Sequence, residues 1–500
     1  MNKKGIAAAL LGAGGLLVVG GAWYTGTQTE SMLQAQIDEA NARLASHWTS
    51  GNVVLELTDF HRGLFSSEAI YAFHVYDEDL QTTSLSWTSQ IEHGPVPLSR
   101  LVTLKLWPVM ARVTTELEPN ELTSKLYPNT DTAPLTGDMV IHYGGGVAGQ
   151  VRFAATEIES DTARLNFSGL QMDFASDASA EHIRLKAHTD NIEVATLSDE
   201  PVTVSLSGIR YETDLTTHSS GLHLGKSRFE LAQLEVLLPD DVAIGATRMI
   251  QTDELYEENG MISGNTRYDQ GPLTYNGEAL GSLSTRWSYS GLDPVALNSL
   301  SDLYLGALTG APVAPSDAMQ RVEEAFSALL AGEPKLSLDS LEIRTANGRS
   351  ELSLSADLTL PASRKLPSAE DAVEVLSRAS AKLNLSKAML RDISLMQGLA
   401  EPELDKQEIA NRADMFAAMV GEMAVAMELA VAEGEDALIS DLQYADGKLQ
   451  LNGKEIDLAA LSAMLALVMP QGAQNKHEHD DPLGGLTDEE LELLLGDWQN

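Results

Sequence analysis

Residues 202–211 read Val-Thr-Val-Ser-Leu-Ser-Gly-Ile-Arg-Tyr, an alternation of apolar and polar side chains. Successive side chains of a β-strand point to opposite faces of a sheet, so this pattern predicts a strand with one apolar and one polar face. Further runs with the same period of two are residues 164–174, 227–236 and 283–289. Turn signals such as Asn276-Gly277 separate the runs. Residues 51–294 are therefore expected to form a β-rich, repeat-like region.

Three strand-like segments share a Ser-Gly break within the alternating pattern. The breaks are Ser168-Gly169, Ser207-Gly208 and Ser290-Gly291. A glycine inside a strand permits a bulge or a bend. The breaks therefore favour a long curved antiparallel sheet.

Helical periods enter in the second half of the chain. The expected helices are Ser316–Leu330, Pro367–Met396, Pro402–Ala432 and Leu458–Val468, and a break near Leu383 is left open in the second. Hairpins are expected at Asn347-Gly348 and near Asp446-Gly447. Residues 295–470 should thus combine hairpins with covering helices, and residues 471–500 should form an acidic mobile tail. The predicted fold class is α+β and β-rich, with an N-terminal transmembrane helix, a long curved antiparallel sheet and helices in the C-terminal half.

Residues 5–24 form an uncharged, mostly apolar run that follows Lys3 and Lys4. Its length is close to the roughly 20 residues that span a bilayer as a helix. The lysines place residues 1–4 in the cytoplasm, and the bulk of the chain then lies on the far side of the membrane. The predicted topology is a single-pass signal-anchor. A cleaved signal peptide is the alternative, which the length of the run disfavours.

Residues 25–50 are expected to form a helical stalk. Leu33, Ile37, Ala40 and Leu44 recur at helical spacing, which gives a stripe that can dock on the body. Small residues in the anchor could also let two helices approach closely, so a homodimer stays open.

The composition excludes several classes of partner and chemistry. The 500 residues carry a formal net charge of −40, which repels the phosphates of nucleic acid and anionic lipid headgroups. A hydrophobic content of 43% is too high for a disordered chain. The chain has no cysteine, which removes disulfides, thiolate nucleophiles and iron–sulfur clusters.

No motif predicts a catalytic, cofactor-binding or metal site. Gly144, Gly146 and Gly149 match G-x-G-x-x-G, but the residues after them alternate like a strand, where a nucleotide site needs a helix. Neither a G-x-S-x-G elbow nor an H-E-x-x-H pair occurs. The hypothesis of a hydrolase that acts on an envelope polymer rests only on abundant acidic residues, which have no specificity.

One predicted helix carries a methionine stripe at successive i+4 positions: Met415, Met419, Met423 and Met427. Flexible thioethers suit a promiscuous apolar surface, so the stripe could face a lipid or another apolar ligand. The favoured alternative is that it packs against the sheet.

Two motifs near the start of the body are more specific than a generic strand sequence. The first is Phe60-His61-Arg62-Gly63-Leu64-Phe65-Ser66-Ser67-Glu68-Ala69, and the second is His93-Gly94-Pro95-Val96-Pro97-Leu98. With residues 20–26 and 442–458, they resemble the YdgA-like family of bacterial envelope proteins. The resemblance implies an N-terminal anchor and a long extracytoplasmic body, and it supplies no catalytic residues. The motif positions of unknown role are His61, Arg62, Gly63, Phe65, Ser66, His93, Gly94 and Pro95.

Together with this resemblance, the sequence favours a single-pass protein of a bacterial inner membrane, with the N-terminus cytoplasmic, the bulk of the chain periplasmic and no enzymatic activity. Its sheet would bind or handle a lipid or another hydrophobic envelope component. The alternative is a scaffold for envelope proteins, dimeric through anchor and stalk.

Overall fold

The computed structural model describes residues 37, 38, 41, 53–63, 65–76, 82–93, 96–127, 133–198, 200–240, 242–309, 315–361, 372–399 and 405–457. The apolar run at 5–24, the expected helix at 458–468 and the acidic tail lie outside them. Within the described residues, no helix has the length and hydropathy to cross a membrane. The chain divides into two compact units, with the change from unit 1 to unit 2 after Glu230.

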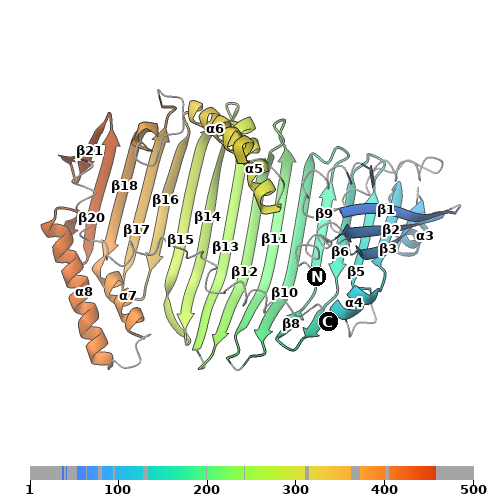
Figure 1. Ribbon diagram of the computed structural model, residues 1–500, viewed down its shortest axis with the longest axis horizontal. Helices are drawn as coiled ribbons and strands as arrows, with labels where there is room; N and C mark the ends of the chain where they lie inside the picture. Colours follow the sequence, from blue (N-terminus) through green and yellow to red (C-terminus); the bar gives the residue numbers. More distant parts are fainter. Residues whose placement is uncertain are drawn as a thin grey trace. The chain divides into compact units, whose positions relative to one another are not determined.

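Unit 1 is built on an antiparallel sheet of nine strands in the order β1-β2-β3-β4-β5-β6-β9-β10-β11 (Figure 1). Their bounds are β1 Val53–Arg62, β2 Ser66–Tyr76, β3 Thr82–His93, β4 Ala111–Leu117, β5 Leu135–Ile141, β6 Val147–Phe153, β9 Leu170–Ser176, β10 His182–Thr196 and β11 Thr203–Thr217. β7 (Thr156–Glu159) pairs with β8 (Ala163–Phe167), which also pairs with β10. Two short helices, α3 (Leu98–Val102) and α4 (Glu121–Leu126), flank β4 in the chain.

Unit 2 continues the same antiparallel pattern in the order β13-β14-β15-β16-β17-β18-β20-β21-β22, with β19 also on β20. The bounds are β13 Val242–Glu258, β14 Met261–Tyr275, β15 Glu278–Leu292, β16 Lys335–Arg344, β17 Arg349–Leu358, β18 Leu376–Ser386, β19 Val431–Glu433, β20 Ala437–Ala445, β21 Lys448–Leu451 and β22 Lys454–Ile456. α7 (Lys387–Leu399) and α8 (Lys406–Ala426) lie beside the last strands (Figure 1). β12 (His223–Leu238), α5 (Pro294–Thr309) and α6 (Pro315–Ala331) contribute residues to both units.

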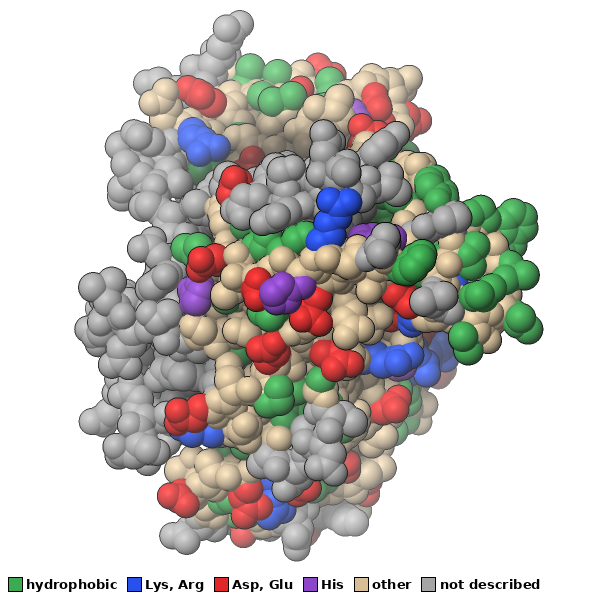
Figure 2. Space-filling view, turned by 90° about the vertical axis from the view of Figure 1, so that its right-hand side faces the viewer, with side chains coloured by type: hydrophobic (Ala, Val, Ile, Leu, Met, Phe, Trp, Pro, Cys, Tyr) green, Lys and Arg blue, Asp and Glu red, His purple; other side chains and the backbone are tan. Residues whose placement is uncertain are grey.

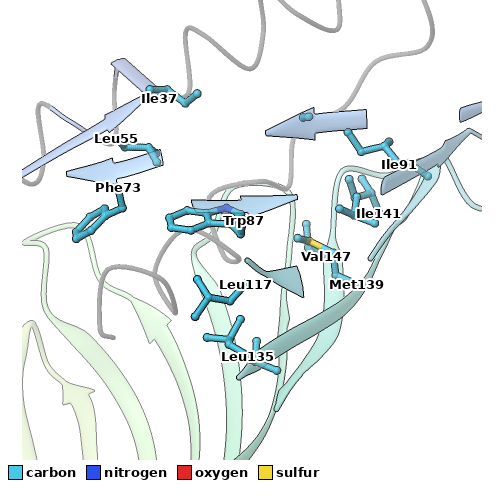
Figure 3. Packing of buried hydrophobic residues seen from close by; sticks show 14 of the residues in the cluster. Ile37, Leu55, Phe73, Trp87, Ile91, Leu117, Leu135, Met139, Ile141 and Val147 are labelled. Carbon is cyan, nitrogen blue, oxygen red and sulfur yellow. The ribbon is translucent and has the colours of Figure 1, made fainter. Parts of the chain in front are cut away.

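The best-packed core of unit 1 lies on one face of β1–β6. Strand β4 shows why: its alternate residues Ala111, Val113, Thr115 and Leu117 are buried, as the period of two requires. Figure 3 shows Phe73, Trp87 and other side chains of this cluster together with Ile37 from the expected stalk. Ile37 is 4% exposed, so this part of the stalk docks on the body.

A side chain from the same stalk forms hydrogen bonds with the backbone of the edge strand β1. Asn41 Nδ2 donates to the carbonyl oxygen of Leu55, and the Leu55 N–H donates to Asn41 Oδ1, at 2.9 and 2.8 Å. The amide therefore satisfies a backbone pair that a neighbouring strand would otherwise bind.

Most of the elements expected from the sequence are confirmed. The β-rich class, the antiparallel pairing, α6 and the hairpin β16–β17 all appear. The helix expected to reach Ala432 appears as α8 but ends at Ala426, and residues 431–433 form strand β19. The G-x-G-x-x-G segment forms the β5–β6 turn and the first residues of β6, so a strand and not a helix follows it. Gly169, Gly208 and Gly291 have φ of +94°, +66° and +75°, so each Ser-Gly break does need a glycine.

The expected helix at 367–396 is wrong over its middle part. Residues 372–375 form a short 3₁₀ helix, residues 376–386 form strand β18, and α7 begins at Lys387. Ala379, Ala381, Leu383 and Leu385 alternate with polar residues, which is the strand period. The helix-favouring alanines and leucines obscured that period, and pairing on both sides with β17 and β20 decides the structure.

Candidate functional site

The two sequence motifs lie together at one end of unit 1. The first makes the turn between β1 and β2, where the Gly63 N–H donates to the Ser66 carbonyl oxygen at 2.8 Å. The second ends β3, and the His93 N–H donates to the Phe65 carbonyl oxygen at 2.9 Å. Phe65 is 74% exposed. Gly94 and Pro95 lie outside the described residues.

The two motif histidines face opposite sides of the sheet. Ser67 is the cross-strand partner of Arg62, and its hydroxyl lies 3.0 Å from His93 Nε2 on the buried face. His61 is opposite Glu68, one position along, so its side chain points to the other face. There it lies 3.1 Å from Asp59 Oδ2. His61 and His93 therefore do not come together to form a joint ligand site.

His93 sits in an environment that disfavours its protonation. Partial burial, followed by the positive charge of Arg62, lowers the pKa of His93 below its ordinary value. The imidazole is thus held neutral near Ser67 at ordinary pH, which suits a structural hydrogen bond at the end of β3.

The chain between β3 and β4 forms a projecting apolar surface that we call the apolar lobe, residues 101–107. Its side chains are exposed to an unusual degree: Val102 and Trp107 at 84%, Leu104 at 80%, Leu106 at 57% and Leu101 at 51%. Figure 2 looks at this end of unit 1 and shows hydrophobic side chains gathered on a projecting part of the surface. Soluble surfaces rarely gather so many large apolar side chains unless they meet a partner or a membrane.

The base of the apolar lobe is fixed on both sides. Pro97 is buried before α3, and Val109 and Met110 are buried after the lobe. The Ser99 N–H and hydroxyl both donate to the Glu92 carboxylate. The projecting residues are therefore held out from the sheet by a packed and hydrogen-bonded base.

A network of charged side chains supports the same base. Glu92 Oε2 lies 3.7 Å from Arg112 Nη1, and Arg112 donates through Nε and Nη2 to the two carboxylate oxygens of Asp138, at 2.9 and 2.8 Å. These hydrogen bonds to Asp138 raise the pKa of the Arg112 guanidinium, so it stays charged.

The apolar lobe was not singled out from the sequence, although a signal was present. No Asp or Glu occurs between Glu92 and Glu116, whereas the whole chain has 73 acidic residues. Within this interval Arg100 and Lys105 lie in or next to the run Leu-Val-Thr-Leu-Lys-Leu-Trp. An acid-free apolar interval in so acidic a chain is the feature that would have identified it.

In unit 2, one face of the sheet is apolar across six strands. A single row of cross-strand partners consists of Trp287, Leu338, Leu354, Ala381, Leu442 and Leu451, which we call the apolar row. The next row faces the other way and consists of Ser288, Ser337, Ser355, Ser380, Gln443 and Gln450. The sheet therefore separates an apolar from a polar face without exception in these two rows.

The apolar row is only partly covered. Leu338 is 5% exposed, but its neighbours Trp287 and Leu354 are 47% and 39% exposed. Leu336, two residues before Leu338 on the same strand and face, is 43% exposed. An antiparallel sheet normally packs its apolar face on a second layer, whereas the described part of the chain covers this face incompletely.

α8 packs mainly against α7, and small residues line its packed side. Ala413 and Ala417 are 0% and 7% exposed, and a side chain at Gly421 would come within 3.8 Å of Leu438, which is itself 2% exposed. Gly398 of α7 packs on Ile409. These contacts fix which side of α8 faces the protein.

The methionine stripe consequently points outward. Met415 and Met419 are 67% and 57% exposed, while Met423 and Met427 are half-buried. The favoured interpretation that this stripe packs in the core is wrong for Met415 and Met419, because α8 packs through the alanine and glycine positions instead. Its role toward an apolar ligand stays a prediction.

These features define a β-sheet protein that leaves apolar surfaces uncovered. Among the described side chains, no group of three or more His, Asp or Glu is placed to hold a metal ion. The chain belongs to the family described as "Bacterial protein of unknown function (DUF945)", whose model matches residues 1–459.

The chain is 25% identical to protein YdgA of Escherichia coli (strain K12), over 94% of this chain and 98% of YdgA. It is also 23% identical to the uncharacterized protein YihF of the same organism, over 87% of this chain and 93% of YihF. The resemblance to the YdgA-like family inferred from the motifs is thus confirmed. No solved structure matches the chain.

Proposed function

We propose that the protein is held at a bacterial inner membrane by residues 5–24 and that its sheet, on the periplasmic side, binds lipid or another hydrophobic envelope component. The observation that carries this proposal is the apolar row of unit 2, whose Trp287 and Leu354 stay 47% and 39% exposed. The topology rests on Lys3, Lys4 and the apolar run that follows them.

The energetics favour an apolar occupant on this face. Each square ångström of apolar surface removed from water stabilises a complex by about 25 cal/mol. A chain of CH₂ groups laid along the row would cover Trp287, Leu354 and Leu336 at once, without any hydrogen-bonding requirement. The acidic surface elsewhere would not oppose this contact, because an acyl chain carries no charge.

The test uses the full chain in vesicles with a phosphatidylethanolamine that carries a photoactivatable diazirine on its acyl chain. Mass spectrometry then maps the crosslinked residues. We expect crosslinks on the apolar row, lost in Leu354→Glu and kept in Ser353→Glu. The two positions are neighbours on β17 and face opposite sides of the sheet. Crosslinks confined to residues 5–24, or equal labelling of both variants, would contradict the proposal.

A second candidate function is an envelope scaffold, and exposed α8 favours it. Met415, Met419 and Phe416 lie on one side of the helix and are 67%, 57% and 39% exposed. Flexible methionines suit a surface that binds other proteins. Because the natural chain has no cysteine, Met415→Cys provides a single thiol, and oxidation in membranes should yield a disulfide-linked homodimer if two copies meet there.

A further inference from the structure

We propose that the apolar lobe, residues 101–107, inserts into the interfacial region of a lipid bilayer and gives the protein a second membrane contact besides residues 5–24. This inference uses residues of unit 1 alone and does not depend on ligand binding by the apolar row of unit 2.

The shape of the lobe suits a bilayer surface. Val102, Leu104 and Trp107 are all at least 80% exposed, and they project from a fixed base instead of lining a cavity. Interfacial apolar segments bury their side chains by about 5–10 Å at the boundary between headgroups and acyl chains. Tryptophan is enriched at that boundary because its ring is apolar and its N–H is polar. Trp107 provides such a ring.

The charge of the lobe distinguishes it from the rest of the surface. Lys105 is exposed and Arg100 is half-buried, while no acidic residue lies between Glu92 and Glu116. Arg112, the other basic residue with a described place at the lobe's base, is engaged by Glu92 and Asp138. Two cations beside an apolar tip match the phosphates of lipid headgroups.

The net charge of −40 does not prevent this contact. At physiological ionic strength the Debye length is about 8 Å, so an interfacial contact responds mainly to the charges next to it. The sequence expectation that anionic headgroups are repelled applies to the acidic body. At the lobe, the local charge has the opposite sign.

A backbone feature indicates that the lobe serves a purpose other than stability. Helix α3 ends in a Schellman motif, in which the Leu104 N–H donates to Leu101 and the Lys105 N–H donates to Arg100, at 3.1 and 2.9 Å. The position with positive φ in this motif is usually glycine, but here it is Leu104, with φ of +57°. A large apolar side chain, 80% exposed, thus stands at a strained position. This placement is unfavourable in water and favourable in a membrane.

The test places an environment-sensitive fluorophore on a single cysteine in the full chain. Val102→Cys reports on the lobe, and Glu157→Cys on β7, also exposed in unit 1, is the matched control. The proteins are reconstituted in vesicles of phosphatidylethanolamine and phosphatidylglycerol, with or without lipids that carry a quenching nitroxide on the acyl chain. We expect a shift to shorter emission wavelength and nitroxide quenching at residue 102, and neither at residue 157.

A second substitution tests the cause of the signal. Leu104→Asp introduces a residue type that tolerates positive φ, and it replaces the apolar side chain with an anion. In Val102→Cys it should abolish the quenching while circular dichroism stays unchanged. Vesicles of phosphatidylcholine alone should give weaker quenching than anionic ones if Arg100 and Lys105 contribute.

Three outcomes would overturn the proposal. The label at residue 102 could remain as water-exposed as the control. It could already be shielded in detergent-free protein without lipid, which would show that this chain or a second copy covers the lobe. Its quenching could also survive Leu104→Asp in full, which would assign the signal to membrane attachment through another part of the chain.

Discussion

Leu104 shows how a single residue can reveal a conflict between stability and another requirement. Its φ of +57° is one that an L-amino acid with a large side chain adopts at a cost of about 1–2 kcal/mol, and glycine adopts it without that cost. Because the side chain is 80% exposed, it gains little from packing in return.

We therefore expect Leu104→Gly to raise the free energy of unfolding by about 0.5–1 kcal/mol, after allowance for the larger entropy of the unfolded glycine. The measurement is the midpoint of urea unfolding of Leu104→Gly, and the midpoint of Leu106→Gly is the control. Leu106 is also exposed but does not have a positive φ, so its substitution should leave the midpoint unchanged or lower it. An equal response of both variants would show that backbone strain at Leu104 is not the cause.

Asp392 is a buried residue on α7 that holds the β16–β17 turn. Its carboxylate accepts hydrogen bonds from Thr345 Oγ1, the Asn347 N–H and Asn347 Nδ2, at 2.6, 2.9 and 2.8 Å. Burial alone would raise the pKa of Asp392, but these hydrogen bonds outweigh it and the net pKa is lowered. The folded chain therefore binds this proton less readily than the unfolded chain.

From this we expect Asp392→Ala to lower the free energy of unfolding by about 1–3 kcal/mol near neutral pH, because it removes three hydrogen bonds to a buried carboxylate. The contribution of Asp392 is present above its unfolded pKa of about 4 and is lost as the pH falls through the lower folded pKa. Urea unfolding at several pH values measures both effects. Asp414→Ala, at an exposed ion pair with Arg391, is the control and should change the midpoint little. A constant difference between wild type and Asp392→Ala down to strongly acidic pH would exclude this linkage.

At the scale of elements, α8 shows that the sequence does not determine which side of a helix packs against the protein. The stripe Ile409, Ala413, Ala417 and Gly421 and the stripe Met415, Met419, Met423 and Met427 have the same i+4 spacing. Periodicity alone therefore predicts two packing sides, and hydrophobicity favours the wrong one. The structure selects the small residues because they allow α8 to lie close to Leu438.

This packing predicts opposite results for neighbouring substitutions. Ala413→Leu adds volume where the side chain is 0% exposed and should cost about 1–3 kcal/mol. Met415→Leu lies where the side chain is 67% exposed and should change stability by less than about 0.5 kcal/mol. Hydrogen exchange of the α8 amides, with urea unfolding, measures both. Greater damage from Met415→Leu would place the methionine stripe against the protein.

For the whole molecule, the sequence predicts those features that a local periodicity of apolar residues determines. The strands, their turns and the antiparallel class follow from alternation and from Asn-Gly and Asp-Gly pairs, such as Asp446-Gly447, where both residues have positive φ. The apolar row could not be predicted, because the pairing of Trp287 with Leu338, and of Ala381 with Leu442, depends on register across distant strands. The exposure of single side chains could not be predicted either. Leu338 and Leu354 both lie in alternating apolar patterns, but only Leu354 remains exposed.

A further prediction for the whole molecule concerns the side of the membrane on which the proposed anchor would place the two units. Residues 5–24 follow Lys3 and Lys4, and the first charged residue after them is Glu30. Lysines are retained on the cytoplasmic side during insertion, so the two units should be periplasmic. Both the lipid contact of the apolar lobe and the proposed ligand of the apolar row would then belong to the envelope.

The absence of native cysteine makes this topology directly measurable. In bacteria whose outer membrane is permeabilised, a membrane-impermeant maleimide should modify Glu157→Cys, which is exposed on β7, and should leave Asn2→Cys unmodified until the inner membrane is disrupted. Replacing Lys3 and Lys4 by glutamate should reduce modification of Glu157→Cys, because the retained charge that orients the anchor is lost. Modification of Asn2→Cys in intact spheroplasts would show that the chain has the opposite orientation. Recovery of the Glu157→Cys protein in the soluble periplasmic fraction, shortened at its N-terminus, would show that residues 5–24 are a cleaved signal and that any remaining membrane contact must come from the body.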